Sequence, residues 1–314
     1  MQILVSGGAG FIGSYLCEKL LKERNRVICV DNLITGSESN IEEFKKNKKF
    51  NFLKKDVVEP FSLNGFGKID QIYHLASPAD PSHYLKYPIE TLLANSLGTY
   101  NLLKLALRTR AKFLYASSSE VYGDPKEHPQ KESYFGNVNP VGVRSCYDEG
   151  KRFGEALVRA YYKKYKLDVR IIRIFNTYGP KMHLEEGRMV PNFIMRALKN
   201  KPLPIYGDGK NTRSLCYISD LVEGLVLAMN KKGTAGEVFN LGNPDEYSVE
   251  QFAKIVIESL GSNSKIEFEN EWEDDPKRRK PDISKAKRVL NWQPKIPLRS
   301  GLKITAAYFK NILK

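Results

Sequence analysis

Cysteine and histidine are scarce in this chain of 314 residues, which contains four of each. Cys17, Cys29, Cys146 and Cys216 stand singly, without the paired spacing of zinc ligands or of a disulfide framework. The histidines show no ligand spacing either, so no metal site is expected. Long apolar runs are also absent, because none approaches the roughly 20 residues that a membrane-spanning helix needs.

The first residues lead directly into a glycine-rich motif and leave no room for a signal peptide. We therefore expect a cytoplasmic protein that does not enter the membrane. Acidic residues are outnumbered, with 36 Asp and Glu against 50 Lys and Arg, which gives a net charge of +14. Basic stretches at 45–49, 163–166 and 277–280 could mark an RNA-binding surface. Dispersed solvated surface is the favoured interpretation, and such a surface would also attract an anionic nucleotide.

Strand and helix patterns alternate along the first 175 residues, which predicts an α/β fold with a doubly wound parallel sheet of the Rossmann type. The expected helices are 11–24, 89–108 and 147–165, and the expected strands are 2–6, 26–30, 50–53, 71–75, 112–116 and 169–174.

The pattern changes after residue 175, where a loop, a helix at 189–198 and a turn-rich segment at 202–213 predict a smaller C-terminal α/β substrate lobe. A strand at 238–242 suggests that the chain returns to the first lobe. The expected division is a cofactor domain at 1–176, with returning segments near 215–242, and a second lobe formed mainly by 177–314.

A glycine motif joins the first predicted strand to the first predicted helix. Gly7 and Gly8 permit the tight turn, Gly10 permits close approach of a pyrophosphate, and Gly13 permits helix-to-strand packing. The phosphates would lie at the positive end of the helix. Asp31 ends the next strand, where a carboxylate binds ribose hydroxyls and repels a 2′-phosphate, so NAD is favoured over NADP.

Other residues are expected to contact the same cofactor. Asp56 and Val57, after the third strand, are candidates for the adenine, although a plain surface loop is nearly as good an interpretation. The remaining candidates are Phe11, Ile12, Asn32, Leu75, Ala76 and Asn95.

Tyr147 and Lys151 are four residues apart and so fall on one face of a predicted helix. A phenol has an ordinary pKa of about 10. A lysine ammonium and the positive nicotinamide ring can lower this pKa, which would make the tyrosine a base near neutral pH. The alternative is a helix surface that carries this pair by chance, but the upstream NAD motif favours a catalytic pair.

A polar segment follows the strand predicted at 112–116, at the end of the sheet where ligands bind in such folds. Ser118 or Ser119 could share a sugar hydroxyl proton with Tyr147, and Glu120 is a candidate acid or base at the sugar ring. The alternatives are a serine turn and a helix-capping or solvent-exposed glutamate.

Together these motifs resemble the extended short-chain dehydrogenase/reductases that modify nucleotide sugars, a group of NAD-dependent epimerases and dehydratases. Segments 122–130, 144–152 and 173–180, with the later run 274–282, are similar to the UDP-glucuronate decarboxylase family, also called UDP-xylose synthases. The resemblance extends from Gln2 to the C-terminal helix.

The resemblance implies a reaction and roles for matching residues. Tyr147 would take the C4 hydroxyl proton while NAD accepts the C4 hydride, and Lys151 would hold the cofactor ribose. The 4-keto acid would lose carbon dioxide, and NADH would return its hydride to C4. Glu120, Ser119 and Arg279 would surround the sugar carboxylate and the C5 protonation step. A guanidinium suits a carboxylate, whereas the alternative for Arg279 is a solvated basic run; Pro276 and Pro281 favour a shaped loop.

The substrate implied by the resemblance is UDP-glucuronate. Asn176 and Asn192 would lie near its phosphates or sugar, Tyr206 and Arg213 near uracil, ribose or pyrophosphate, and Tyr84 over the sugar. The family also implies a homodimer through the helices at 89–108 and 147–165.

Several functions remain open at this stage. The 4,6-dehydratases use an Asp-Glu pair where this chain has Ser119-Glu120. Epimerases commonly lack a carboxylate at that position, so UDP-glucuronate 4-epimerase is the second candidate after decarboxylase. An enzyme that stops at the 4-keto pentose and releases NADH is another alternative. An inactive relative that binds RNA is a fourth, although the Tyr147/Lys151/Glu120 set argues against it.

Overall fold

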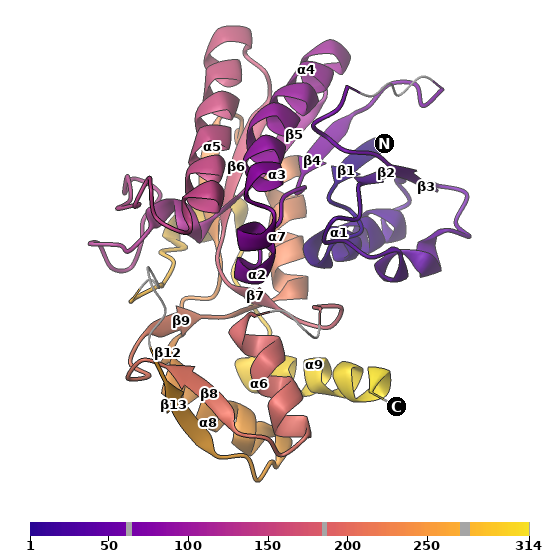
Figure 1. Cartoon of the computed structure of the whole chain (residues 1–314). Helices are drawn as coiled ribbons and strands as arrows, with labels where there is room; N and C mark the ends of the chain where they lie inside the picture. Colours follow the sequence, from indigo (N-terminus) through magenta and orange to yellow (C-terminus); the bar gives the residue numbers. More distant parts are fainter. Residues whose placement is uncertain (61–64, 184–186, 271–276, 314) are drawn as a thin grey trace.

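The computed structural model describes residues 1–60, 65–183, 187–270 and 277–313. Seven parallel strands form the main sheet (Figure 1). Their spatial order is β11 (Glu237–Leu241), β6 (Val169–Ile174), β5 (Lys112–Ser118), β4 (Gln71–His74), β1 (Gln2–Ser6), β2 (Arg26–Asp31) and β3 (Phe50–Lys54). The expected α/β fold is thereby confirmed.

Helices cover both faces of this sheet, which explains why its central strands are continuous apolar runs rather than alternating ones. On one face lie α1 (Phe11–Lys22) and α7 (Ile218–Asn230), and on the other lie α4 (Thr99–Thr109) and α5 (Ser145–Tyr165) (Figure 1). Each face therefore has its own buried apolar cluster.

The strand order reverses between β1 and β4, because the chain runs outward from β1 through β2 to β3 and then resumes on the other side. In open α/β sheets the crevice at the carboxyl ends of the strands beside such a reversal binds ligands. The glycine motif follows β1, and Leu75 and Ala76 follow β4, so both segments border that crevice.

The single helix predicted at 89–108 is interrupted. The structure has α2 (Pro81–Lys86), α3 (Pro88–Leu93), a π-helical turn (Ala94–Gly98) and then α4. Such turns occur as local bulges in α-helices and are frequent at functional sites. The turn predicted within 202–213 is present at 207–209, but the segment also includes β8 (Leu203–Tyr206) and the start of β9 (Thr212–Ser214).

A smaller lobe lies below the carboxyl ends of the main strands (Figure 1). Two strand pairs contribute to it: β8 with β13 (Ile266–Glu269), and β9 with β12 (Glu246–Ser248). Its helices are α6 (Met189–Leu198), α8 (Val249–Leu260) and α9 (Leu298–Ile312), and β7 (Thr177–Tyr178) with β10 (Cys216–Tyr217) joins it to the larger lobe. Short 3-10 turns occur at Glu38–Asn40, Glu42–Phe44 and Ser119–Tyr122, and a π-helical turn at Ala286–Leu290.

The division at residue 176 stays a prediction, although β11 does lie in the main sheet beside β6. Within the described ranges, every helix is too short or too polar to cross a bilayer. The expected cytoplasmic location likewise stays a prediction.

Candidate active site

Steric contacts explain two glycines of the loop between β1 and α1. Gly7 has a φ of +73°, and a Cβ atom there would lie 2.7 Å from the Ala76 nitrogen. A Cβ atom on Gly13 would lie 2.0 Å from the Gly7 carbonyl oxygen. Gly10 precedes α1 and supplies no capping side chain, so the first N–H groups of this helix have no side-chain cap. This arrangement suits a diphosphate.

Asp31 is buried at the end of β2 and faces the same cavity. Its carboxylate accepts hydrogen bonds from the Ala9 nitrogen at 3.0 Å and from the Leu33 nitrogen at 2.9 Å. Burial raises the pKa of Asp31, and these two bonds oppose that rise. Asn32 donates to Asp56 at 2.8 Å, which joins the ends of β2 and β3.

Of the residues predicted to contact the cofactor, Asn95 is the one that does not line the cavity. It is fully buried in the π-helical turn, donates to Ser77 at 2.8 Å and accepts from Tyr115 at 3.0 Å. Ser77 does line the cavity, so Asn95 lies behind the cavity wall. The others line it: Gly7, Gly10, Phe11, Ile12, Gly13, Asp31, Asn32, Asp56, Val57, Leu75, Ala76, Tyr147 and Lys151.

Tyr147 and Lys151 lie on the buried face of α5, and the lysine nitrogen is 5.6 Å from the centre of the tyrosine ring. Lys151 donates to the Ala116 carbonyl at 2.8 Å, and burial lowers its pKa to about 7. Burial raises the pKa of Tyr147, and a hydrogen bond with Ser118 and the charge of Arg188 oppose this rise. In the protein alone, Ser118 and Arg188 thus favour the phenolate, and the expected contribution of Lys151 stays a prediction.

Glu120 is held between two arginines from different parts of the chain. Arg279 donates to both carboxylate oxygens, to Oε1 from Nη1 and to Oε2 from Nη2 at 2.8 Å. Arg144 also donates to Oε2. Burial alone would raise the pKa of Glu120, but the two guanidinium groups hold it well below the ordinary range. Glu120 is therefore an ionised carboxylate at neutral pH.

Asp148 is a second carboxyl group close to this cluster, one residue after Tyr147. It is 6% exposed, and its Oδ2 lies 3.9 Å from Nε of Arg144. Burial and repulsion by Glu120 raise the pKa of Asp148. The cluster thus combines one ionised carboxylate with one whose proton is retained to higher pH.

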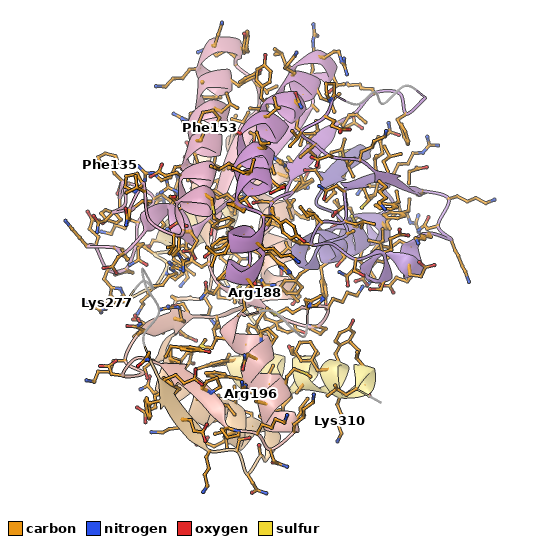
Figure 2. All side chains as sticks on the ribbon, in the orientation of Figure 1. Phe135, Phe153, Arg188, Arg196, Lys277 and Lys310 are labelled. Carbon is orange, nitrogen blue, oxygen red and sulfur yellow. The ribbon has the colours of Figure 1, made fainter. Side chains whose placement is uncertain are left out.

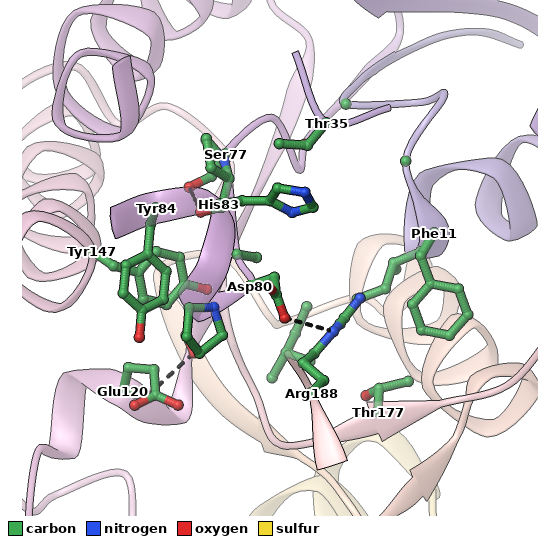
Figure 3. A pocket seen from close by; sticks show the side chains of 18 of the residues that line it. Phe11, Thr35, Ser77, Asp80, His83, Tyr84, Glu120, Tyr147, Thr177 and Arg188 are labelled. Atoms are coloured by element: carbon green, nitrogen blue, oxygen red, sulfur yellow. Dashed lines mark hydrogen bonds and ion pairs between the residues drawn. The ribbon is translucent and has the colours of Figure 1, made fainter. Parts of the chain in front are cut away.

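The residues predicted to bind the nucleotide sugar also line the cavity: Tyr84, Asn176, Asn192, Tyr206 and Arg213. The ring of Tyr84 stacks on that of Tyr147, with centroids 5.1 Å apart and planes 11° from parallel (Figure 3). The Tyr84 hydroxyl and the Asn192 amide oxygen are buried and have no hydrogen-bond partner among the described residues. Such groups are available to a ligand.

The sequence did not single out two arginines that line the cavity, Arg144 and Arg188. Arg188 lies between the two lobes (Figure 2), 3.5 Å from the Asp80 carboxylate and over the Phe11 ring (Figure 3). Its position just before α6 gave no signal in the sequence. Arg144 did offer a clue, because it precedes Tyr147 by one helical turn.

The cavity measures about 520 Å³ and extends from the glycine loop to Arg213 and Arg279. It therefore contains a dinucleotide-type phosphate cradle, a buried tyrosine with a nearby lysine, and a carboxylate fixed by arginines. This combination fits proton and hydride chemistry on an anionic substrate.

Comparisons with known proteins agree with this geometry. The profile of the NAD dependent epimerase/dehydratase family matches residues 3–242. The chain therefore belongs to this family.

Within the family, the chain is 51% identical over 310 residues to UDP-glucuronic acid decarboxylase 4 of Arabidopsis thaliana, covering 99% of this chain and 69% of that one. It is 50% identical over 313 residues to UDP-glucuronic acid decarboxylase 1 of Xenopus tropicalis, covering 100% and 73%. The sequence-based resemblance is confirmed.

Solved structures show the same fold. UDP-glucose 4-epimerase of Thermotoga maritima, determined with UDP-glucose, has a TM-score of 0.91 at 30% identity and full coverage of both chains. UDP-glucuronic acid 4-epimerase of Bacillus cereus, in complex with UDP-glucuronic acid and NAD, has a TM-score of 0.90 at 31% identity, covering 99% of this chain and 100% of that one.

Proposed function

We propose that this protein converts UDP-glucuronate to UDP-xylose and carbon dioxide through a 4-keto intermediate, with NAD regenerated in the site. The observation that carries the proposal is the ionised Glu120, held by Arg279 and Arg144 in the same cavity as Tyr147. Decarboxylases at about 50% identity over nearly the whole chain support the same reaction.

The cofactor half of the cavity, which we define as the glycine loop, Asp31 and the ends of β3 and β4, fits NAD. The turn at Gly7 and the start of α1 would hold the diphosphate, and Asp31 would bind the adenosine ribose. A 2′-phosphate would meet the Asp31 carboxylate, which disfavours NADP. When bound, NAD supplies the acceptor and later the donor of the C4 hydride.

Tyr147 would remove the proton from the C4 hydroxyl, with Ser118 as its hydrogen-bond partner. Burial raises its pKa in the protein alone, so the positive charges of Lys151 and of the oxidised cofactor would have to favour the phenolate. Lys151, fixed by the Ala116 carbonyl, would hold the cofactor ribose.

The substrate half, which we define as the Ser118–Glu120 segment, Arg144, Arg279 and the residues predicted to bind UDP, would perform decarboxylation. The 4-keto group accepts the electrons that carbon dioxide leaves at C5, so loss of carbon dioxide needs little further catalysis. Glu120 is ionised and so cannot itself donate the C5 proton. It would instead orient a water molecule, with Ser119 beside it.

The nucleotide is expected to lie against Asn192, Tyr206 and Arg213, with Asn176 near the phosphates and Tyr84 over the sugar. All five line the cavity, and two of them have buried polar atoms without partners among the described residues. Arg213 and Arg279 provide positive charge for a substrate with a diphosphate and a carboxylate.

UDP-glucuronate 4-epimerase is the second candidate, because a solved relative with that activity shares the fold. The two functions separate when purified protein is incubated with NAD and UDP-glucuronate while carbon dioxide, NADH absorbance and the product NMR spectrum are followed. Carbon dioxide with UDP-xylose and no accumulating NADH supports the proposal. Carbon dioxide with stoichiometric NADH means an oxidative enzyme, and UDP-galacturonate without carbon dioxide means an epimerase.

We also propose that the protein is a homodimer that pairs through α3 to α5. Large apolar side chains on these helices are exposed, with Ile89 at 62% and Tyr100 at 41%. Phe153, on α5, is 53% exposed (Figure 2). Light scattering should give twice the mass of the chain, and F153D should give the single mass. F135D is the matched control, because Phe135 is 88% exposed on a loop outside these helices. A wild-type protein of single mass would contradict the proposal.

A further inference from the structure

Arg279 lies in a short segment that is attached to the rest of the protein on both sides. On the N-terminal side, the Lys277 nitrogen donates to Asp124 Oδ1 at 3.1 Å, and the Lys277 carbonyl accepts from the Thr212 nitrogen at 2.9 Å. These contacts fix the segment to both lobes, because Asp124 follows β5 and Thr212 begins β9.

On the C-terminal side, the segment is attached to Gln130, and Asn240 also donates to the Asp282 carbonyl at 3.2 Å. The Gln130 nitrogen donates to the Lys280 carbonyl at 2.8 Å, and the Asp282 nitrogen donates to the Gln130 carbonyl at 2.8 Å. The side chain adds a third bond, because its Oε1 accepts from the Lys280 nitrogen at 2.8 Å. Gln130 is fully buried, and its Nε2 donates to the Glu127 carbonyl at 2.8 Å.

The side chain of Gln130 thus fixes the backbone immediately after Arg279. Both oxygens of Glu120 are bonded by the Arg279 guanidinium, an arrangement that depends on the direction in which the segment presents this side chain. We propose that Gln130 is a positioning residue for Arg279, which keeps its guanidinium placed to hydrogen-bond both carboxylate oxygens of Glu120. This inference rests on the proposed function, in which Arg279 and Glu120 act on the sugar carboxylate.

The contacts of Gln130 favour this role over general packing. Both polar atoms of its side chain are used locally, one to fix the loop at Glu127 and the other to fix Lys280. Loss of Oε1 leaves the Lys280 N–H without this acceptor, while the two backbone bonds to the segment survive. The segment should stay in place but lose its orientation. Small misplacements of a catalytic group lower rates by up to about 100-fold.

The test is a double-mutant cycle with Q130M and R279M, because methionine keeps most of the glutamine volume but cannot accept from Lys280. Q71M is the matched control: Gln71 is also buried, at 2% exposure, and bonds to Asn230 at the opposite end of the sheet. We expect Q130M to lower kcat for carbon dioxide release about tenfold. The dissociation constant for NAD should stay within about twofold of wild type, because the substitution leaves the cofactor half intact.

In the R279M background, Q130M should change kcat by less than about twofold, since the residue through which it acts is already gone. R279Q, which also removes the positive charge, serves as the background if R279M does not fold. Hydrogen exchange of segment 277–283 should be faster in Q130M than in Q71M. Losses that multiply in the double variant, or a Q130M enzyme with wild-type kcat, would overturn the role of Gln130. A wild-type enzyme that releases no carbon dioxide would instead overturn the proposed function.

Discussion

In the cofactor half of the cavity, Asp31 accepts hydrogen bonds from the backbone of Ala9 and Leu33, whereas in the substrate half Glu120 is held by the side chains of Arg279 and Arg144. The first set of contacts spans at most 22 residues of chain, and the second spans up to 159. Backbone atoms therefore shape one half, and paired charges from distant segments shape the other.

The two halves therefore differ in the amino-acid substitutions that each tolerates. A backbone cradle depends on the absence of side chains at Gly7 and Gly13 and is indifferent to remote charges. A buried charge cluster depends on every member, because removal of one partner leaves an uncompensated charge. Substitutions that touch one half only should separate cofactor binding from chemistry.

The largest effect is expected at Tyr147, where the two halves meet. Y147F removes the group that takes the C4 proton and should lower kcat by about 10³-fold, within the usual range for a general base. Stopped-flow formation of NADH would measure this loss. Y165F is the control, since Tyr165 ends the same helix, is 44% exposed and lies outside the set of residues that line the cavity. Equal losses in both variants would argue against Tyr147 as the base.

Glu120 tests the substrate half alone. E120Q keeps the shape but removes the charge that Arg279 and Arg144 hold, so carbon dioxide release should fall by about 10²-fold. The dissociation constant for NAD, measured by calorimetry, should stay the same. An E120Q enzyme with weakened NAD binding and normal turnover would reverse the assignment of the two halves.

Asp31 provides the matching test of the cofactor half, again as a carboxylate-to-amide change. D31N should weaken NAD binding by about 10- to 100-fold, because hydrogen bonds to a charged group contribute about 1.5–3 kcal/mol. It should also reduce the preference over NADP, since the repulsion of a 2′-phosphate is lost. Turnover at saturating NAD should change little. Unchanged selectivity between NAD and NADP in competition titrations would show that Asp31 does not set it.

The smallest effect is a difference in acid sensitivity. Burial, aided by the nearby Lys151, lowers the pKa of His74 from 6.5 to about 3, and the ring bonds to Ser6 and Thr99. As pH falls below 6.5 the unfolded state gains a proton that the folded state does not, so stability is lost with falling pH. The pKa of Glu120 is also lowered, from 4.5, so its contribution is lost only below about pH 4.5.

Urea unfolding at pH 7 and pH 5.5 would separate the contribution of His74, which changes below pH 6.5, from that of Glu120, which changes only below about pH 4.5. Wild type should lose about 1 kcal/mol more than H74N between the two values. E120Q should lose at least as much as wild type, because it leaves His74 in place and removes the charge that raises the pKa of Asp148. If E120Q lost less unfolding free energy than wild type between these pH values, the acid sensitivity would come from Glu120 in the substrate half and not from His74.

Most of the fold could be predicted from the sequence, because it depends on local patterns. The strands Gln2–Ser6 and Val169–Ile174 and the helix Met189–Leu198 have the predicted bounds. The break in the helix predicted at 89–108 could not be predicted, because the π-helical turn accompanies contacts of Asn95 with Ser77 and Tyr115. The same contacts explain why Asn95 lies behind the cavity wall instead of lining it.

Part of the candidate site could also be predicted, because that part depends on local sequence patterns. Tyr147 and Lys151 were found because their spacing places them on one helix face, and both line the cavity. Arg188 was missed because its contacts with Asp80 and Phe11 are made between segments far apart in the sequence. Of the run 274–282 that suggested a shaped loop, Pro276 lies outside the described residues, and Pro281 pairs with Gln130 in an isolated bridge.

The sequence by itself determined the cofactor half, because glycine sterics, a strand-ending aspartate and a helical Tyr/Lys spacing act over short stretches of chain. Only the tertiary structure determined which charged side chains form ion pairs. Glu120 could have paired with any nearby cation, and folding brought it Arg279 from 159 residues away and Arg144 from the start of α5. The pKa values of Glu120 and Asp148 follow from that meeting, because burial and neighbouring charge are properties of the folded chain alone.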